Sequence, residues 1–528
     1  MARFSLSLPR PHRRLHGLPY YWQALIVVMI GSFMAMLDAT VVNIALPRII
    51  TVFNAPVDAA QFVLTGYMIA LAIIMPATGY LSDTFGTKRI YLVSMLLFTV
   101  GSLFCGLSWS VESLVLARIF QGLGGGMMMP LGMTVIFKTV PLEKRGLVTG
   151  VFGLPLLFAP VFGPTLGGYI VEYISWRFIF TLNLPIGALG LFLGWILLRE
   201  TERIPDLGFD LRGFLLAGSG FGATFYGLSQ APDWGWGAEK TVALLAGGGV
   251  LLVLWVAVEL TESQPLVELR VFRNGTYALA TSINFIVTLG MFSSMLLLPL
   301  FLQNFRGLGA METGLLMLPQ ALASGLVMPI SGQLFDKIGP RPLIVSGLLL
   351  LAYATWQLGG LDLTTSDAAM RDILIMRGAA MGLIMMPAMT VAMNTLPPSL
   401  IARGSSLTNV LRQLFGAFGT AIFVTLLQTR QTYHQAMLSQ AVTPDLPGVR
   451  QTLAGVQQYL VAHGATLAQA KAAGVMVLYK QMAMRAAVLS FEDCFVVAAA
   501  VCLFGIVPAV FLRSSGVARR TGRPMAPE

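Results

Sequence analysis

Asp38 lies inside the apolar run FMAMLDATVVNIALP, residues 33–47. A charged side chain at the centre of a bilayer costs about 2.5 to 3.5 kcal/mol or more, so this position calls for a function or a partner. Burial favours the protonated form of a carboxyl group, which suits Asp38 to binding and releasing a proton near neutral pH. The alternative is a packing role, in which Asp38 is hydrogen-bonded to a neighbouring helix. Thr40 and Asn43 could share either role.

A second charge, Arg118, begins the segment RIFQGLGGGMMMP, residues 118–130, in another apolar run. At about 1.5 Å per helical residue, Asp38 lies roughly 25 Å along its span, and Arg118 about 9 Å along a span of opposite direction. In a hydrocarbon core about 30 Å thick, the two are therefore expected at similar depth. An arginine beside the carboxylate would favour its charged form, opposing the effect of burial. Depth does not fix helix rotation, so contact between the two stays open.

The glycine run in the same segment does not fit the pattern G-x-G-x-x-G and follows no strand, which argues against a phosphate-binding loop. Small residues at such a place let two helices approach closely. The neighbouring methionines are expected to be adaptable lining or to contact lipid.

Two further arginines, Arg377 and Arg412, are predicted midway along other spans, the latter in NVLRQLFGAFG, residues 409–419. Asp38 is the only carboxylate that the sequence places deep in a span. This excess of arginines over carboxylates within the spans favours neutral or weakly acidic amphipathic substrates. Alternatively, the two arginines could do no more than bridge helices. The candidate substrate-pocket residues share polar or adaptable side chains within the spans: Thr40, Asn43, Gln121, Met127, Arg377, Asn409, Arg412 and Gln413.

The composition indicates that membrane-spanning helices position these residues. The chain has 528 residues, of which 56% are hydrophobic and 11% charged, whereas soluble chains carry about 25% charged residues. Roughly fourteen segments have the 20 or so apolar residues that a membrane helix needs. They centre near residues 30, 70, 97, 125, 157, 189, 220, 251, 289, 323, 350, 383, 417 and 500. The sequence therefore predicts an all-α polytopic membrane protein.

The basic residues behind the net charge of +10 are concentrated outside the predicted spans. Lysines and arginines gather in both tails and in alternate loops, as cytoplasmic segments do, which predicts that both termini are cytoplasmic. The basic balance therefore needs no nucleic acid as a partner. The three cysteines are scattered and fit neither a metal site nor a disulfide framework. No nucleophile, general base or nucleotide site presents itself, so we expect no enzyme and no cofactor.

An internal repeat links two positions far apart in the chain. GYLSDTFGTKR, residues 79–89, follows the second span, and GQLFDKIGPRP, residues 332–342, follows the tenth. Parallel repeats of this kind build one large class of secondary transporter. Asp83 and the basic pair Lys88 and Arg89 could form a network that opens and closes as two halves rock. Alternatively, the basic pair could merely set topology. The candidate switch residues are Gly79, Asp83, Gly86, Lys88, Arg89 and Asp336.

The repeat and the span count together predict the organisation of the chain. Its parts, in order, are a cytoplasmic tail (1–20), a six-helix bundle (21–200), two linker transmembrane helices (201–275), a second six-helix bundle (276–512) and a cytoplasmic tail (513–528). Within the second bundle, residues 429–487 are predicted to form one long polar loop on the outer side. This loop is expected to be helical in its second half, with a turn at TPDLPG.

These motifs, in this order, resemble the major facilitator superfamily, specifically its fourteen-span drug:proton antiporter branch typified by EmrB and QacA. GLPLLFAPVFGPTLGG, residues 153–168, resembles the fifth-span motif associated with antiporters. Its prolines loosen the helix, and its glycines offer a small packing face. The residues carried over from that motif are Gly153, Pro155, Gly163, Pro164, Gly167 and Gly168.

The resemblance implies a proton-coupled multidrug exporter in a bacterial inner membrane, driven by the proton-motive force, with Asp38 and Arg118 in proton coupling. It also implies a periplasmic adaptor and an outer-membrane channel, for which residues 429–487 are a natural docking surface. That segment could equally be a partly ordered loop without a partner. A dedicated exporter of one metabolite would share every motif, and a non-transporting receptor or scaffold on the same fold is a further alternative.

Overall fold

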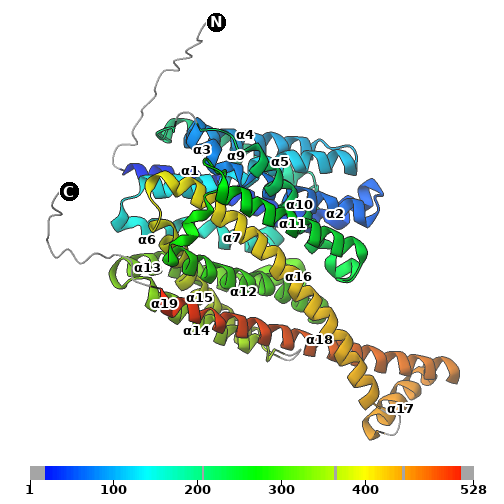
Figure 1. Ribbon diagram of the computed structural model, residues 1–528. Coiled ribbons are helices and arrows are strands. Elements are labelled where there is room, and N and C mark those ends of the chain that lie inside the picture. The colour runs from blue at the N-terminus through cyan, green and yellow to red at the C-terminus, as the bar shows by residue number, and fades with distance from the viewer. Residues whose placement is uncertain (1–17, 205–206, 362–364, 443–445, 513–528) are drawn as a thin grey trace.

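A computed structural model of the chain describes residues 18–204, 207–361, 365–442 and 446–512, which are almost entirely helical and contain no strand. The helices run roughly parallel in one elongated bundle (Figure 1). Helix α1 begins and helix α19 ends at the same end of this bundle, here called the terminal end. The opposite end, here called the far end, carries a protruding helical hairpin (Figure 1).

The N-terminal half consists of helices up to Leu197. Its elements are α1 (Tyr20–Phe53), α2 (Val57–Ile74), α3 (Ala77–Phe85), α4 (Thr87–Gly106), α5 (Val111–Thr139), η1 (Leu142–Lys144), α6 (Arg145–Phe152), α7 (Leu154–Tyr173), α8 (Phe178–Thr181) and α9 (Asn183–Leu197). Helices α2 and α3 are bent by 53° relative to each other. The bend falls at Pro76, which lacks a backbone N–H and so cannot continue the hydrogen-bond ladder.

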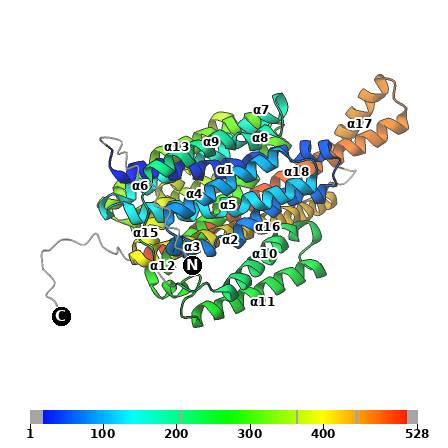
Figure 2. The same cartoon turned by 90° about the horizontal axis from the view of Figure 1, so that it is seen from above.

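Two helices and a short 3-10 turn link the halves. They are α10 (Leu211–Trp234), α11 (Glu239–Thr261) and η2 (Leu269–Arg273). Helices α10 and α11 pack on each other as a hairpin, and α10 also packs against α2 of one half and α16 of the other. Figure 2 shows this linker hairpin on one flank of the bundle.

The C-terminal half begins at Gly275. Its elements are α12 (Gly275–Phe305), α13 (Ala310–Ile338), α14 (Pro340–Leu358), α15 (Asp367–Asn394), η3 (Pro398–Leu400), α16 (Ile401–Ala441), α17 (Pro447–Ala462), α18 (Leu467–Phe504) and α19 (Ile506–Phe511). Helices α16 and α18 continue past the bundle and, with α17, form the protruding hairpin (Figure 1).

The hairpin corrects one expectation about residues 429–487. The first half of this segment is helical as well as the second, because α16 continues to Ala441 without interruption. Its glutamines and alanines are good helix formers outside the membrane too. Residues 443–445 of the predicted turn lie outside the described residues, and α17 begins at Pro447.

Ten helices in the described ranges are long and apolar enough to cross a membrane, or eleven if the bent α2–α3 pair counts as one span. Helices α7, α10 and α14 lie at the three other predicted positions. The prediction of an all-helical membrane protein is confirmed, and helices stand at all fourteen predicted segments. The exact number of spans stays a prediction.

The two halves meet at the terminal end. Helix α16 packs against α3 and α5, and α13 packs against α6 and α7. The Ser405 hydroxyl donates to the Pro130 carbonyl over 2.7 Å, and the Thr149 and Thr390 hydroxyls are 2.9 Å apart. The terminal end is therefore closed in this conformation.

Candidate functional site

Asp38 and Arg118 are in direct contact. The Arg118 Nη1 donates to Asp38 Oδ2 over 2.5 Å, linking α1 to α5. Both side chains are almost completely buried, with 2% of Asp38 and none of Arg118 exposed. The rotation that the sequence left open thus turns both residues inward, as a buried ion pair within the N-terminal half.

Two amide side chains complete the coordination of the carboxylate. The Gln121 Nε2 donates to Asp38 Oδ1 over 3.0 Å, and the Asn183 Nδ2 donates to the same oxygen over 2.9 Å. Both amides also donate to the Ser102 hydroxyl, over 2.6 Å and 3.1 Å. Every hydrogen-bond partner of Asp38 in the described structure is thus a donor, an arrangement that suits the ionised carboxylate.

Arg118 has further partners that hold it in place. Its Nε donates to the Val63 carbonyl over 3.2 Å, and its Nη1 donates to Gln121 Oε1 over 2.6 Å. The guanidinium also lies 3.9 Å from the centre of the Tyr67 ring. A cation over an aromatic face is attracted by the ring quadrupole, most strongly where water is excluded. Five elements, α1, α2, α4, α5 and α9, therefore converge on one pair of charges.

The sequence interpretation missed Asn183, Ser102 and Tyr67. Each is a polar or aromatic residue within an apolar span, which was the only signal available. Asn183 is the clearest of them, because it is buried at the first position of α9. Its relation to Asp38 depends on the packing of α9 against α1 and α4.

Two neighbours of Asp38 in the sequence do not join its site. The Thr40 hydroxyl donates to carbonyls of its own helix and to the Ala159 carbonyl of α7 over 3.3 Å. Asn43 is exposed and donates to the Ala39 carbonyl of its own helix. Thr40 therefore has a packing contact, and Asn43 faces away from the buried pair. Met127, a third pocket candidate, is buried in the core, with 4% of its surface exposed.

The C-terminal half buries a second arginine. Arg377 of α15 is 2% exposed, and its Nη2 donates to the Gly290 carbonyl over 3.2 Å. Its Nε has no hydrogen-bond partner among the described residues. No carboxylate forms an ion pair with it in that part of the chain. Within the described ranges, Arg377 is therefore a buried cation without the carboxylate partner that Arg118 has.

The remaining pocket candidates lie on α16. Arg412 is half-buried, and its Nη2 donates to Asn409 Oδ1 over 2.9 Å. Asn409 is buried and donates to the Ser405 carbonyl. Gln413 lines a cavity of about 310 Å³ between α2, α10 and α16, together with Tyr226 and Asp233 of the linker. Among the predicted pocket residues, Gln121 thus belongs to the buried pair, Arg377 to α15, and these three to α16.

The repeated loop motif contributes one buried carboxylate, Asp83, to the terminal end. Asp83 is 1% exposed and lies 3.2 Å from Lys138 Nζ of α5 and 3.8 Å from Arg403 Nε of α16. A Cβ on Gly79 would lie 2.8 Å from the Arg403 Cα, so this glycine allows the close approach of α16. Asp83 therefore connects both halves.

The basic pair of the motif has a different partner, which corrects the expected network. The Glu200 carboxylate accepts from the Lys88 backbone N–H over 3.0 Å and lies 3.8 Å from Arg89 Nε. The Lys88 ammonium donates to the Trp195 carbonyl. Gly86 has a φ of +97°, which favours glycine and turns the chain between α3 and α4. Lys88 and Arg89 thus contact the end of α9 instead of Asp83.

Asp336 occupies the matching place in the C-terminal half. Its carboxylate accepts backbone N–H groups of Gly146 and Leu147 at the start of α6. A Cβ on Gly332 would clash with the Gly146 carbonyl, so the two backbones touch. Both copies of the repeated motif therefore contribute a carboxylate to the contact between the halves at the terminal end. Asp83 faces cations, and Asp336 faces backbone N–H groups.

The predicted antiporter motif lies on α7 and the residue before it. A Cβ on Gly163 would clash with the Thr40 hydroxyl, and one on Gly167 would lie 2.9 Å from Val41 Cγ1, so α7 packs closely on α1. Gly153 faces Met328 of α13, and Pro155 is buried. A Cβ on Gly168 would meet nothing within 4 Å, so this glycine is not needed for packing. The Pro164 side chain lies outside the described residues.

Two charged groups outside these motifs were not singled out as sites. Glu259 near the end of α11 is fully buried and accepts from Trp255 Nε1 over 2.8 Å and from the Val267 N–H over 3.0 Å. At the far end, the Asp493 carboxylate accepts from Arg430 over 2.6 Å and lies 2.6 Å from His434. Asp493 thus ties α18 to α16 where the hairpin leaves the bundle. No cluster of three metal-ligating side chains occurs among the residues described.

Comparisons with known proteins agree with this architecture. The chain is 34% identical over 423 residues to the multidrug resistance protein B homolog of Mycobacterium tuberculosis, covering 79% of this chain and 77% of the relative. It is 32% identical over 434 residues to the multidrug export protein EmrB of Haemophilus influenzae, covering 80% and 83%. The crystal structure of the human organic anion transporter MFSD10 has the same fold, with a TM-score of 0.58 at 15% identity over 93% of this chain and all of that chain. Residues 28–420 match the model of the Major Facilitator Superfamily, and the chain belongs to that family.

Proposed function

We propose that the protein is a proton-coupled exporter of amphipathic compounds, with Asp38 as the proton-binding group. The buried Asp38–Arg118 pair carries this proposal. In the conformation described, every hydrogen-bond partner of the carboxylate is a donor, so protonation would remove the charge that holds Arg118, Gln121 and Asn183 in place. The names of the two relatives, a multidrug resistance protein B homolog and a multidrug export protein, support export of drugs.

The proposed cycle uses the closure at the terminal end. We assign this end of the bundle to the cytoplasmic side of a bacterial inner membrane. Protonation of Asp38 from the outside loosens its link to Arg118 and favours opening of the cytoplasmic side. Release of the proton there, with substrate bound, favours the return. A proton moving down 100 mV supplies about 2.3 kcal/mol, and each pH unit adds about 1.4 kcal/mol. Such a driving force allows accumulation without ATP.

The proposed substrates are neutral or weakly acidic and hydrophobic. Arg377 supports this assignment, because a buried cation without a carboxylate partner in the described structure attracts negative charge and repels lipophilic cations. The protruding hairpin at the far end is our proposed docking surface for a periplasmic adaptor, which in turn would engage an outer-membrane channel. A dedicated exporter of one metabolite remains the second candidate function, because the same buried groups would serve it equally.

The test is transport in proteoliposomes under an imposed pH gradient, using acidic, neutral and cationic dyes. We expect gradient-driven uptake by the natural protein, with preference for acidic or neutral dyes, and loss of this uptake in Asp38→Asn. Downhill dye exchange should survive in this variant, because the substitution removes the proton site but leaves the fold. The matched control is Glu172→Gln, an exposed carboxylate on α7. Uptake that ignores the gradient, or an Asp38→Asn variant that still concentrates dye, would overturn the coupling role of Asp38.

A further inference from the structure

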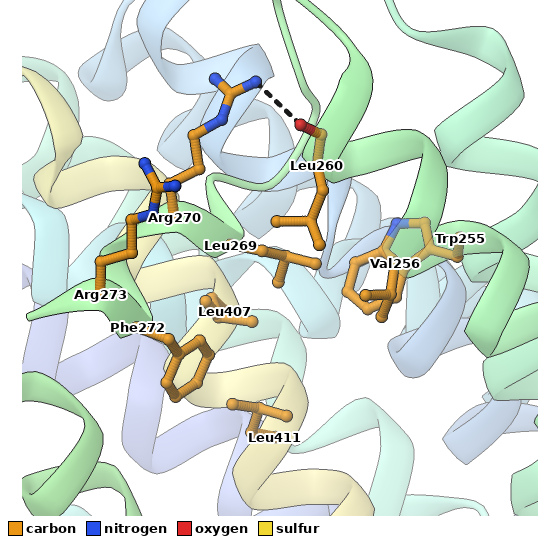
Figure 3. A pocket seen from close by; sticks show the side chains of 9 residues that line it. All are labelled: Trp255, Val256, Leu260, Leu269, Arg270, Phe272, Arg273, Leu407 and Leu411. Atoms are coloured by element: carbon orange, nitrogen blue, oxygen red, sulfur yellow. Dashed lines mark hydrogen bonds between the residues drawn. The ribbon is translucent and has the colours of Figure 1, made fainter.

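A pocket of about 690 Å³ lies outside the buried pair and outside the contact between the halves, where the linker meets the C-terminal half. Its walls come from three elements that are distant in the sequence: the last turns of α11, the turn η2 and the first turns of α16. Val256 and Leu260 of α11 face Leu407 and Leu411 of α16 across the pocket (Figure 3). Most of the pocket lining is apolar.

Two arginines stand at one side of this apolar pocket. Arg270 and Arg273 belong to η2, and side chains three residues apart lie on the same side of a 3-10 helix. Figure 3 shows both guanidinium groups on the same side of the pocket. None of the residues that line it is acidic. The pocket thus combines a localised positive charge with an apolar wall.

The two arginines differ in how they are held. Arg270 Nη2 donates to the carbonyls of Leu260 and Glu262 over 3.2 Å and 3.0 Å, and Arg270 Nη1 lies 3.8 Å from Glu268. Arg270 is therefore fixed at the end of α11. The Arg273 side chain is exposed and makes no hydrogen bond or ion pair within the described part of the chain. Its five donors are available to a ligand.

The position of the pocket indicates which ligand can reach it. It lies where α11 ends and where α12 and α16 begin, at the terminal end on the flank that carries the linker hairpin (Figure 2). Several lining side chains face outward, with 38% of Val256, 48% of Leu260 and 37% of Phe272 exposed. On a membrane protein, apolar side chains exposed on such a flank face lipid, and arginines near the helix ends lie at head-group level.

We propose that this pocket binds one anionic phospholipid, with its phosphate on Arg270 and Arg273 and its acyl chains along Leu411, Phe272 and Val256. The charge of the two guanidiniums complements a phosphate, which arginine binds through paired N–H groups. Basic pockets between membrane helices bind anionic head groups by this combination of charge and apolar surface. Because the pocket joins the linker to α16, the bound lipid braces the linker against the C-terminal half. This proposal does not depend on the transported substrate.

The experiment is native mass spectrometry of the full-length protein released from nanodiscs that contain phosphatidylcholine with or without one-fifth phosphatidylglycerol. We expect one retained phosphatidylglycerol and no retained phosphatidylcholine. Arg273→Gln should reduce retention about tenfold, and because Arg273 has no partner in the described structure the fold is expected to persist. Arg212→Gln is the matched control, an exposed arginine at the start of α10 outside the pocket, and it should leave retention unchanged.

Leu411→Trp, which fills the apolar side, tests the acyl chains. It should reduce phosphatidylglycerol retention as strongly as Arg273→Gln. Retention unaffected by Leu411→Trp, together with displacement of the lipid by millimolar inorganic phosphate, would show a phosphate site and overturn the lipid assignment. Equal loss in Arg212→Gln and Arg273→Gln would show nonspecific attraction to the basic surface, and would also overturn it. Displacement by a transported dye would make the pocket a substrate site instead.

Discussion

In the N-terminal half the buried Arg118 faces the Asp38 carboxylate, a backbone carbonyl and an aromatic ring. In the C-terminal half, by contrast, the buried Arg377 donates to one backbone carbonyl among the residues that the structure describes. Both arginines are almost completely buried. A buried charge is tolerated when it is paired and hydrogen-bonded, and otherwise raises the free energy of the folded state. The first half therefore holds a buried ion pair, and the second holds a buried cation that has no carboxylate partner among the described residues.

The largest effect should come from removing Arg118, with removal of Arg377 as the comparison. Arg118→Met leaves Asp38 buried without its cation, and we expect a loss of about 3–5 kcal/mol in the free energy of unfolding. Arg377→Met removes a charge that has no carboxylate partner within the described ranges, so we expect no loss of stability. Denaturant unfolding in detergent measures both variants. Equal destabilisation would show that Arg377 is compensated after all, and would remove the distinction between the halves.

The second comparison uses two asparagines. Asn183→Leu removes a donor to the Asp38 carboxylate, and hydrogen bonds to charged groups contribute about 1.5–3 kcal/mol. Asn43→Leu removes an exposed side chain that bonds only to its own helix, and it should change stability by less than about 0.5 kcal/mol. The same unfolding measurement applies. A larger effect of Asn43→Leu would contradict the assignment of Asn183 to the Asp38 site and of Asn43 outside it.

Two glycines of α7 test how closely this helix must approach α1. Gly163→Ala places a methyl group against the Thr40 hydroxyl, and such overpacking costs about 1–3 kcal/mol. Gly168→Ala meets nothing within 4 Å and should be neutral or slightly stabilising, because alanine favours helix. Thermal unfolding and dye transport should both separate the two variants. Loss of transport in Gly168→Ala alone would point to a role for this glycine in another conformation.

The smallest effect concerns the closed terminal end. Asp83→Asn weakens contacts to two cations, one of them in the opposite half, whereas Asp336→Asn weakens contacts to backbone N–H groups. We expect Asp83→Asn to shift the balance toward opening by about 1 kcal/mol, several-fold in population, and Asp336→Asn by less. Spin labels at the exposed positions Phe85 and Ile338 would report the distance between the halves. A larger shift in Asp336→Asn would reverse the ranking of the two contacts.

Much of the architecture could be predicted because helix formation and depth are local properties. Apolar runs of sufficient length predicted fourteen helical segments, and the structure has a helix at each of them. The rise per residue placed Asp38 and Arg118 at similar depth, and the two are in contact. The repeated motif likewise predicts two equivalent carboxylates, Asp83 and Asp336, but not their partners.

Only the tertiary structure decided how each helix is rotated and which distant segments meet. Asn183 and Ser102 reach Asp38 because α9 and α4 pack beside it, and Asn43, only five residues from Asp38, faces away. Lys88 lies close to Asp83 in the sequence, but the ion-pair partners of Asp83 are Lys138 and Arg403. The pocket of Arg270 and Arg273 likewise forms only where η2 meets α16. Sequence spacing fixes position along a helix, whereas close packing of side chains from several helices fixes its orientation.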